Sequence, residues 1–157
     1  MSQSAYVIGH QQPDTDAIVS ALCCARLKQA QGTDVVAARA GELNPETQFV
    51  LDRWDVETPT HLTDATDEEL ILVDHNEHSQ TVAGAREATI TEVVDHHRIG
   101  DVTTGDPIPF RAEPLGSTAT ILTELYDEAG VDIDESTAGL LLSGLLSDTV
   151  VLRSPTT

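Results

Sequence analysis

Acidic residues and histidines occur together at four places along the chain, each after an apolar run. The four segments are Gly9–Asp16, Val73–Glu77, Val94–Arg98 and Ser147–Thr149. Two carboxylates about 4 Å apart repel each other by roughly 4 kcal/mol at an effective dielectric constant near 20. Bound divalent cations remove this repulsion, so the four segments together predict a two-metal site for phosphoryl transfer.

The donor atoms that these segments offer are imidazole nitrogens and carboxylate oxygens, without a thiolate. The candidate ligands are His10, Asp14, Asp16, Asp74, His96 and Asp148. This donor set suits six-coordinate Mn²⁺ or Mg²⁺, with Co²⁺ as another option and structural Zn²⁺ less suited. Any one segment alone has an ordinary explanation, since Asp14 has the position of a helix cap. Their joint occurrence favours the metal site.

The elements that must position these residues alternate between strand and helix. Apolar runs predict strands at residues 5–8, 34–38, 70–73 and 90–94, and an edge strand at 108–112. This alternation predicts an α/β domain over residues 1–157, with a predominantly parallel sheet flanked by helices on both faces. Ligands bind beyond the carboxyl ends of such strands, where three of the four segments fall.

Capping residues and apolar residues at helical spacing predict four long helices. They begin at Asp14 or Thr15, at Pro45, at Ser117 or Thr118, and at Glu135. In the second of these helices we expect Phe49, Val50 and Trp54 to face the core. A further short helix is expected near residues 82–86.

The composition limits the partners of the chain. Its 157 residues are enough for one core and predict a single domain. With 8 basic and 27 acidic residues, the formal net charge is −19, which disfavours nucleic acid and anionic membranes as partners. The acidic residues alternate with apolar ones, as in proteins of salt-loving organisms, where about 1 M salt shortens the Debye length to roughly 3 Å. An ordinary acidic protein is the alternative.

The sequence also carries expectations about location and redox chemistry. The N-terminus lacks the pattern of a signal peptide, and no apolar run approaches the ~20 residues of a membrane span. We therefore expect a cytoplasmic location. Cys23 and Cys24 are neighbours in an expected helix and cannot readily bridge, so we interpret them as small buried hydrophobic residues.

Four stretches of the chain resemble the signature motifs of the DHH phosphoesterase superfamily. They are VIGHQQPDTD, ILVDHNE, VVDHHRIGD and LLSDTVVLRSP. The Asp-Thr-Asp form of the first motif, the His-Arg-Ile of the third, and RAEPLGSTATI at residues 111–121 resemble the family II, manganese-dependent inorganic pyrophosphatases in particular. The resemblance runs from Tyr6 to the last residue.

This resemblance implies a role for each site residue. Three residues would hold the first cation: His10, Asp14 and Asp74. Four would hold the second, with Asp74 bridging the two: Asp16, Asp74, His96 and Asp148. His97 would contact the substrate phosphate, and Asp95 would orient a histidine by accepting its free N–H. His75 and Glu77 are expected to line the site.

The same resemblance implies an activity and an assembly. A hydroxide that bridges two divalent cations, Mn²⁺ above all, would hydrolyse pyrophosphate to two orthophosphates, with additional Mg²⁺ arriving with the substrate. The family forms homodimers through this domain. Its members continue into a C-terminal domain that supplies basic contacts. We expect that domain to be absent here, so that the chain is a truncated enzyme with weak or no activity.

Two other functions stay open at this point. A DHH-type phosphodiesterase or short-oligonucleotide nuclease would share the cations, but such enzymes tend to carry Asp-Gly-Asp or Asp-Ala-Asp where this chain has Asp14-Thr15-Asp16. A non-catalytic metal-binding and dimerisation module is the second alternative.

Overall fold

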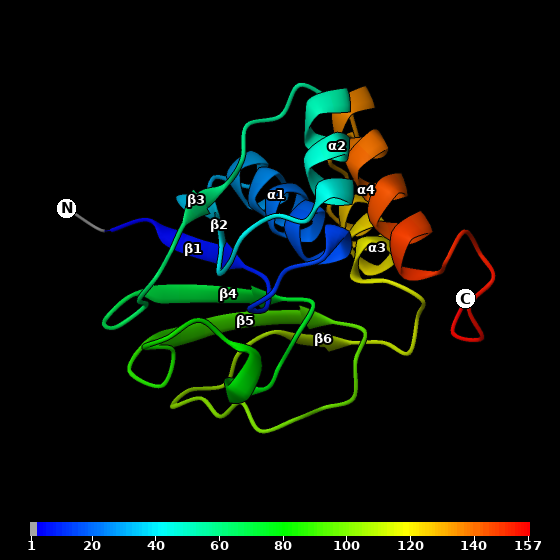
Figure 1. Cartoon of the computed structure of the whole chain (residues 1–157). Helices are drawn as coiled ribbons and strands as arrows, with labels where there is room; N and C mark the ends of the chain where they lie inside the picture. The colour runs from blue at the N-terminus through cyan, green and yellow to red at the C-terminus, as the bar shows by residue number, and fades with distance from the viewer. Residues whose placement is uncertain (1–2) are drawn as a thin grey trace.

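In residues 3–157, which the computed structural model describes, a single sheet is joined by four α-helices and one 3₁₀ helix (Figure 1). The strands are β1 (Ala5–Ile8), β2 (Val35–Arg39), β3 (Thr60–His61), β4 (Glu69–Val73), β5 (Thr89–Asp95) and β6 (Phe110–Ala112). The helices are α1 (Thr15–Ala30), α2 (Pro45–Arg53), η1 (His78–Gln80), α3 (Thr118–Ala129) and α4 (Glu135–Asp148). Strand β3 was not predicted, because its two residues are polar and exposed.

The strand order is β3-β2-β1-β4-β5-β6, and every neighbouring pair is parallel. The chain moves outward from β1 to β3 and then returns to build the sheet in the other direction from β4 to β6. Right-handed crossovers therefore place the connections of the two halves on opposite faces.

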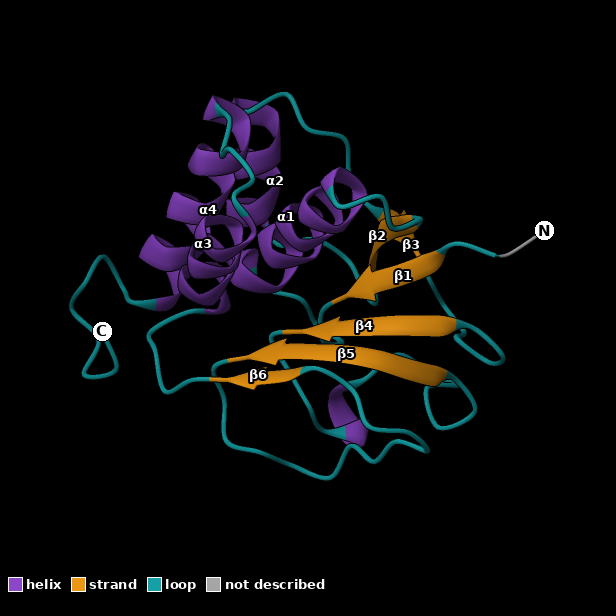
Figure 2. Ribbon diagram, turned by 180° about the vertical axis from the view of Figure 1, so that it is seen from behind, coloured by secondary structure: helices purple, strands orange, loops and turns teal. Residues whose placement is uncertain are grey.

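The predicted α/β fold with a parallel sheet is confirmed, with one difference in how its faces are covered. Figures 1 and 2 show α1 to α4 gathered on one side of the sheet, and η1 with long loops on the other. The second face is thus covered by the β4–β5 and β5–β6 connections and not by an α-helix. The short helix expected near residues 82–86 is a turn, and η1 precedes it.

Successive strand residues face two separate hydrophobic clusters, one on each side of the sheet. Val7 and Val94 pack under the helices, whereas Ile8 and Leu72 point to the other face. Val82, from the β4–β5 connection, belongs to the second cluster. Because both faces are buried at the centre of the sheet, the central strands β1 and β4 are apolar almost throughout, which is typical of parallel sheets.

The predicted starts of the α-helices are confirmed. In each, the capping side chain accepts a hydrogen bond from the backbone N–H three residues later, and the caps are Asp14, Asn44, Ser117 and Asp134. These bonds satisfy N–H groups that have no partner within the helix. The caps therefore fix where α1, α2 and α3 begin, and with them the residues at the rim of the sheet.

The prediction that Phe49 faces the core is wrong, since its side chain is 68% exposed. Helix α2 buries Val50, as predicted, together with Thr47 and Leu51, and these three residues lie at helical spacing on one side. Phe49 falls outside that stripe. Trp54, which follows the helix, is partly buried against the core as expected.

Helix α1 buries both cysteines. Cys23 and Cys24 are unbridged, as predicted, and burial raises the pKa of each thiol to about 12. Within residues 3–157, no helix has the length and apolar character needed to cross a membrane.

Candidate metal centre

The polar segments converge at the carboxyl ends of the central strands. β1, β4 and β5 are adjacent in the sheet, so the residues that follow them share one rim. The structure brings all the predicted ligands into two groups, in each of which the ligand atoms lie within 4.8 Å of one another. The first group is His10, Asp14 and Asp74, and the second is Asp16, Asp74, His96 and Asp148, whereas a further combination adds His97 to Asp74 and His96.

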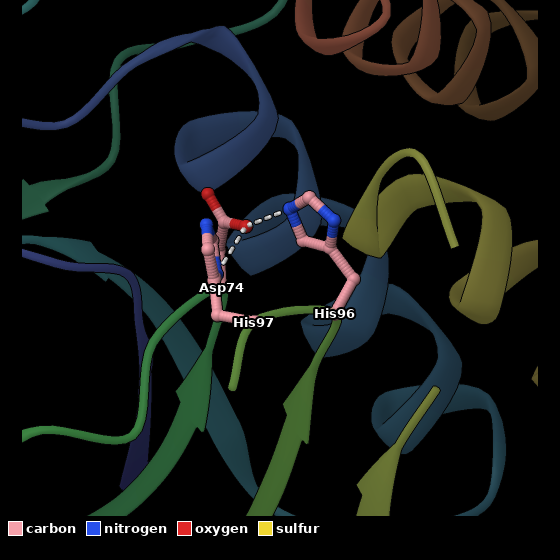
Figure 3. Close-up of side chains that lie close together, drawn as sticks. All are labelled: Asp74, His96 and His97. Atoms are coloured by element: carbon pink, nitrogen blue, oxygen red, sulfur yellow. Dashed lines mark ion pairs between the residues drawn. The ribbon is translucent and has the colours of Figure 1, made fainter. Parts of the chain in front are cut away.

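Asp74 belongs to both groups and is fully buried. It follows β4 in the left-handed backbone region, with φ 63°, which Asp tolerates better than a β-branched residue does. Its Oδ2 lies 3.3 Å from Nε2 of His10, and its Oδ1 lies 3.3 Å from Nε2 of His96. Figure 3 shows His96 and His97 both directed at this carboxylate. Each oxygen of Asp74 thus faces a different part of the cluster.

Asp16 is held by the N-terminus of α3, a contact that sequence analysis missed. The backbone N–H of Thr118 donates to Oδ2 at 2.8 Å, and that of Ala119 donates to Oδ1 at 3.0 Å. The Thr118 hydroxyl also donates to Oδ1 of Asp74 at 3.0 Å. Free N–H groups and the helix dipole stabilise a carboxylate at this end of a helix. The cap at Ser117 was a signal for the helix end, but not for the carboxylate that it faces.

Backbone carbonyls set the tautomers of His10 and His96. Nδ1 of His10 lies 2.8 Å from the carbonyl oxygen of Gln11, and Nδ1 of His96 lies 2.8 Å from that of Leu115. Because a carbonyl only accepts, each Nδ1 carries a proton and donates it. In the neutral ring, Nε2 then presents its lone pair toward Asp74, which is the orientation that an imidazole needs to bind a cation.

His97 is half-exposed and is oriented by Asp95. Its Nδ1 lies 2.7 Å from Oδ1 of Asp95, which is fully buried. The other Asp95 oxygen accepts a hydrogen bond of 2.6 Å from Nδ2 of Asn76. Asn76 also donates to the carbonyl of Arg98 at 2.9 Å. Asp95 therefore lies where the predicted orienting role requires it, and Asn76, which was not predicted, fastens the loop that carries His97.

His75 and Glu77 lie beside this loop and outside both ligand groups. A cavity of about 250 Å³ is lined by His75, Asn76, Glu77, Gln80, His97 and Arg98. Burial lowers the pKa of His75 to about 4, so its ring is neutral at pH 7. Glu77 accepts from the guanidinium of Arg98 at 3.2 Å, so this cation is already paired.

Crowding of the carboxylates shifts the pKa values of their neighbours. Burial acts to lower the pKa of His10, but contact with Asp74 outweighs it and raises the pKa to about 9. Burial is likewise outweighed at His96, whose pKa rises to about 11 beside Asp148 and Asp74. Burial and the charge of Asp74 raise the pKa of Asp14 to about 6. Without a cation, protons on the histidines hold this cluster together.

The residues present fit divalent cations. Oδ2 of Asp74 and Nε2 of His96 are buried without a hydrogen-bond partner, an arrangement that costs free energy unless another group satisfies them. Asp148 is the last residue of α4, where the helix dipole disfavours a carboxylate. Cations with a preference for oxygen and nitrogen donors, such as Mn²⁺ or Mg²⁺, would satisfy all three groups.

The chain is similar to known proteins that are about twice its length. Residues 4–145 match the DHH family, N-terminal domain. A protein of Methanothrix thermoacetophila named manganese-dependent inorganic pyrophosphatase is 49% identical over 157 residues, which are 99% of this chain and 50% of that protein. The chain spans about half the length of the curated relatives that it matches.

Solved structures show the same architecture. A Methanococcus jannaschii protein assigned to the family II inorganic pyrophosphatases superposes with a TM-score of 0.90 at 42% identity, over 98% of this chain and 51% of that one. An exopolyphosphatase-related protein of Bacteroides fragilis shares the fold with a TM-score of 0.72 at 17% identity, over 98% of this chain and 48% of that one. The resemblance read from the four motifs is confirmed, and the chain belongs to the DHH family.

Proposed function

We propose that this chain is the cation-binding domain of an enzyme that hydrolyses pyrophosphate to two orthophosphates with two divalent cations. The observation that carries the proposal is the pair of donor groups that share Asp74. The name of the Methanothrix relative favours Mn²⁺ and pyrophosphate. Co²⁺ or Mg²⁺ could occupy the same donors.

Each residue has a distinct part in this proposal. One cation is held by His10, Asp14 and Asp74. The other is held by Asp16, Asp74, His96 and Asp148. The cations supply positive charge and acidify a water between them for attack on phosphorus. His97 presents its Nε2 side to a phosphate oxygen because Asp95 holds Nδ1. The bond to Asp95 raises the pKa of His97, which favours the charged ring that a phosphate attracts.

Charge balance limits what this chain does alone. The four carboxylates of Asp14, Asp16, Asp74 and Asp148 balance two divalent cations, so the charge of pyrophosphate needs further cations. Arg98, which borders the cavity beside His97, is already paired with Glu77. Additional Mg²⁺ bound to the substrate would supply this charge, and because Arg98 is already paired we propose weak turnover by this chain.

An orthophosphate-release assay with Mn²⁺ tests the proposal. Pyrophosphate, a cyclic dinucleotide and a linear dinucleotide are compared at equal concentration, with Mn²⁺ binding measured alongside by calorimetry. We expect about two Mn²⁺ per chain and slow release from pyrophosphate only. Faster cleavage of a dinucleotide would favour the phosphodiesterase alternative. Two bound cations with no turnover of any substrate would favour the non-catalytic module.

Other expectations from the sequence stay predictions. They are a single self-contained domain, a cytoplasmic location, a homodimer formed through this domain, the lack of nucleic-acid and membrane partners, and adaptation to high salt. The sheet edges in the described residues are β3 and β6, and both are very short. Light scattering of the chain in solution would test the dimer directly.

A further inference from the structure

A carboxylate outside the two ligand groups connects the helix ends that carry them. Oε1 of Glu46 accepts a hydrogen bond from the hydroxyl of Thr15 at 2.5 Å and another from the hydroxyl of Ser147. Thr15 lies between two candidate ligands at the start of α1, and Ser147 directly precedes Asp148 at the end of α4. One oxygen atom thus joins the first and the last segments of the candidate metal centre.

Helix α2 holds Glu46 in place. Asn44 caps the helix by accepting from the N–H of Thr47 at 2.8 Å, and Glu46 lies in its first turn. The hydroxyls of Thr47 and Thr15 lie 2.9 Å apart, and both residues are fully buried. Since the carboxylate only accepts, Thr15 donates to Glu46 and Thr47 donates to Thr15. The direction of these bonds is therefore fixed.

The position of Asp148 depends on the link between α4 and α1 through Glu46 more than the position of Asp16 does. Two backbone N–H groups of α3 hold Asp16, whereas the carboxylate of Asp148 forms an ion pair with Nε2 of His96 at 3.0 Å. It also carries its charge at the unfavourable end of a helix dipole. Its position follows from where the end of α4 lies, and the bond from Ser147 to Glu46 ties that end to α1.

We propose that Glu46 is a positioning residue that keeps Asp148 aligned with the first segment by binding the hydroxyls of Thr15 and Ser147. The proposal rests on the proposed function, because it concerns the affinity of the cation group that includes Asp148. The two bonds also hold the pKa of Glu46 below its usual range, so the side chain is charged at neutral pH. Glu46 is exposed, and competition from water keeps the expected effect moderate.

Calorimetric Mn²⁺ titrations of matched variants test this role. Glu46→Ala removes the acceptor, and Glu46→Gln keeps an amide oxygen that can still accept both hydroxyls. Asp52→Ala removes an exposed carboxylate from the same helix as a control. We expect Glu46→Ala to weaken one of two Mn²⁺ equilibria about tenfold, as loss of an outer hydrogen-bond partner does. The Gln variant should restore most of the affinity, and the control should leave both equilibria unchanged.

Ser147→Ala removes one bond only and provides a second test if Glu46→Ala does not fold. It should weaken the same equilibrium without changing the thermal unfolding of the cation-free chain by more than the control does. Equal loss in the Ala and Gln variants would make Glu46 a direct ligand and overturn the proposal, as would unchanged binding in Glu46→Ala and Ser147→Ala. If the original chain bound no Mn²⁺, the proposed function would fall as well. If every variant bound two Mn²⁺ with unchanged affinity, the positioning role of Glu46 would be refuted and the proposed function would stand.

Discussion

Nε2 of His96 lies 3.3 Å from Oδ1 of Asp74, and this nitrogen and the other oxygen of Asp74, Oδ2, are both buried without a hydrogen-bond partner. The pairing of β4 with β5 produces this contact, because Val73 is level with Val94 and the next residues leave the sheet together. Two motifs that are distant in sequence therefore deliver a carboxylate and an imidazole to one point.

Asp74→Asn should impair both cation groups, whereas Asp148→Asn should impair chiefly one. Asp74 is the residue that the two groups share, and its substitution removes a negative charge from both. We expect affinity losses at least as large as the ~100-fold upper range known for outer partners of metal ligands. Manganese titration of the two variants checks this, and equal, intact binding in the Asp74 variant would refute the bridging role.

The stability of the cation-free chain should fall as the pH rises from about 6.5 to about 9. The pKa values of His10 and His96 are raised to about 9 and about 11 in the folded chain. A raised pKa contributes stability in full below the unfolded value of about 6.5, and this contribution is lost as the pH passes the folded value. Mn²⁺ displaces the same protons, so its affinity should rise over the same range.

Thermal unfolding in a chelator and in saturating Mn²⁺ measures this effect. The decline should be present in the chelator and absent with Mn²⁺. A cation-free chain whose midpoint stays level from pH 6.5 to 9 would contradict the raised histidine pKa values.

Thr118→Val should destabilise the chain by about 1–3 kcal/mol, the cost of removing a donor from a buried charged acceptor. The valine keeps the shape of the side chain and the N–H that binds Asp16, but removes the hydroxyl that donates to Asp74. Thr118→Ser keeps the hydroxyl and serves as the control. Urea unfolding of both variants checks the difference, and equal stability would show that Asp74 does not need this donor.

Gly144→Ala should also be destabilising, by about 1–3 kcal/mol for overpacking. A Cβ atom at this position would lie 2.6 Å from Cγ2 of Val19 and 3.0 Å from Oδ1 of Asp16. Valine is stiff at its first side-chain torsion, so it cannot easily move away. Gly105→Ala, in a loop, is a control for the loss of a glycine without a clash, because nothing lies within 4 Å of its Cβ position. A Gly144 variant as stable as this control would show that α4 can shift away from α1.

Sequence analysis could locate most of the elements and the candidate ligands that the structure brings together, because both depend on local patterns. The caps at Asp14 and Asn44 and the apolar run before Asp74 each mark an element end, and parallel strands bring their carboxyl ends together. The exposure of Phe49 was missed because α2 is short and carries apolar residues both on its buried side, at Val50 and Leu51, and on its exposed side, at Phe49. The cover of the second sheet face by loops and the short helix η1 was missed for a related reason, since the residues near Val82 are compatible with both a turn and a short helix.

The supporting contacts could not be read from the sequence. Thr118 reaches Asp16 and Asp74 only because α3 points its first turn at them, and Glu46 meets Ser147 across most of the chain. Such contacts depend on how helices dock, which is set by packing and not by spacing. They are also the contacts through which ligands acquire their orientation.

The anomalous scattering of manganese in crystals of this chain soaked in Mn²⁺ tests the central claim most directly. The account predicts two difference peaks on either side of Asp74, one beside His10 and Asp14 and the other beside His96 and Asp148. A map without a peak at these residues, or with a single peak that does not contact Asp74, would contradict it.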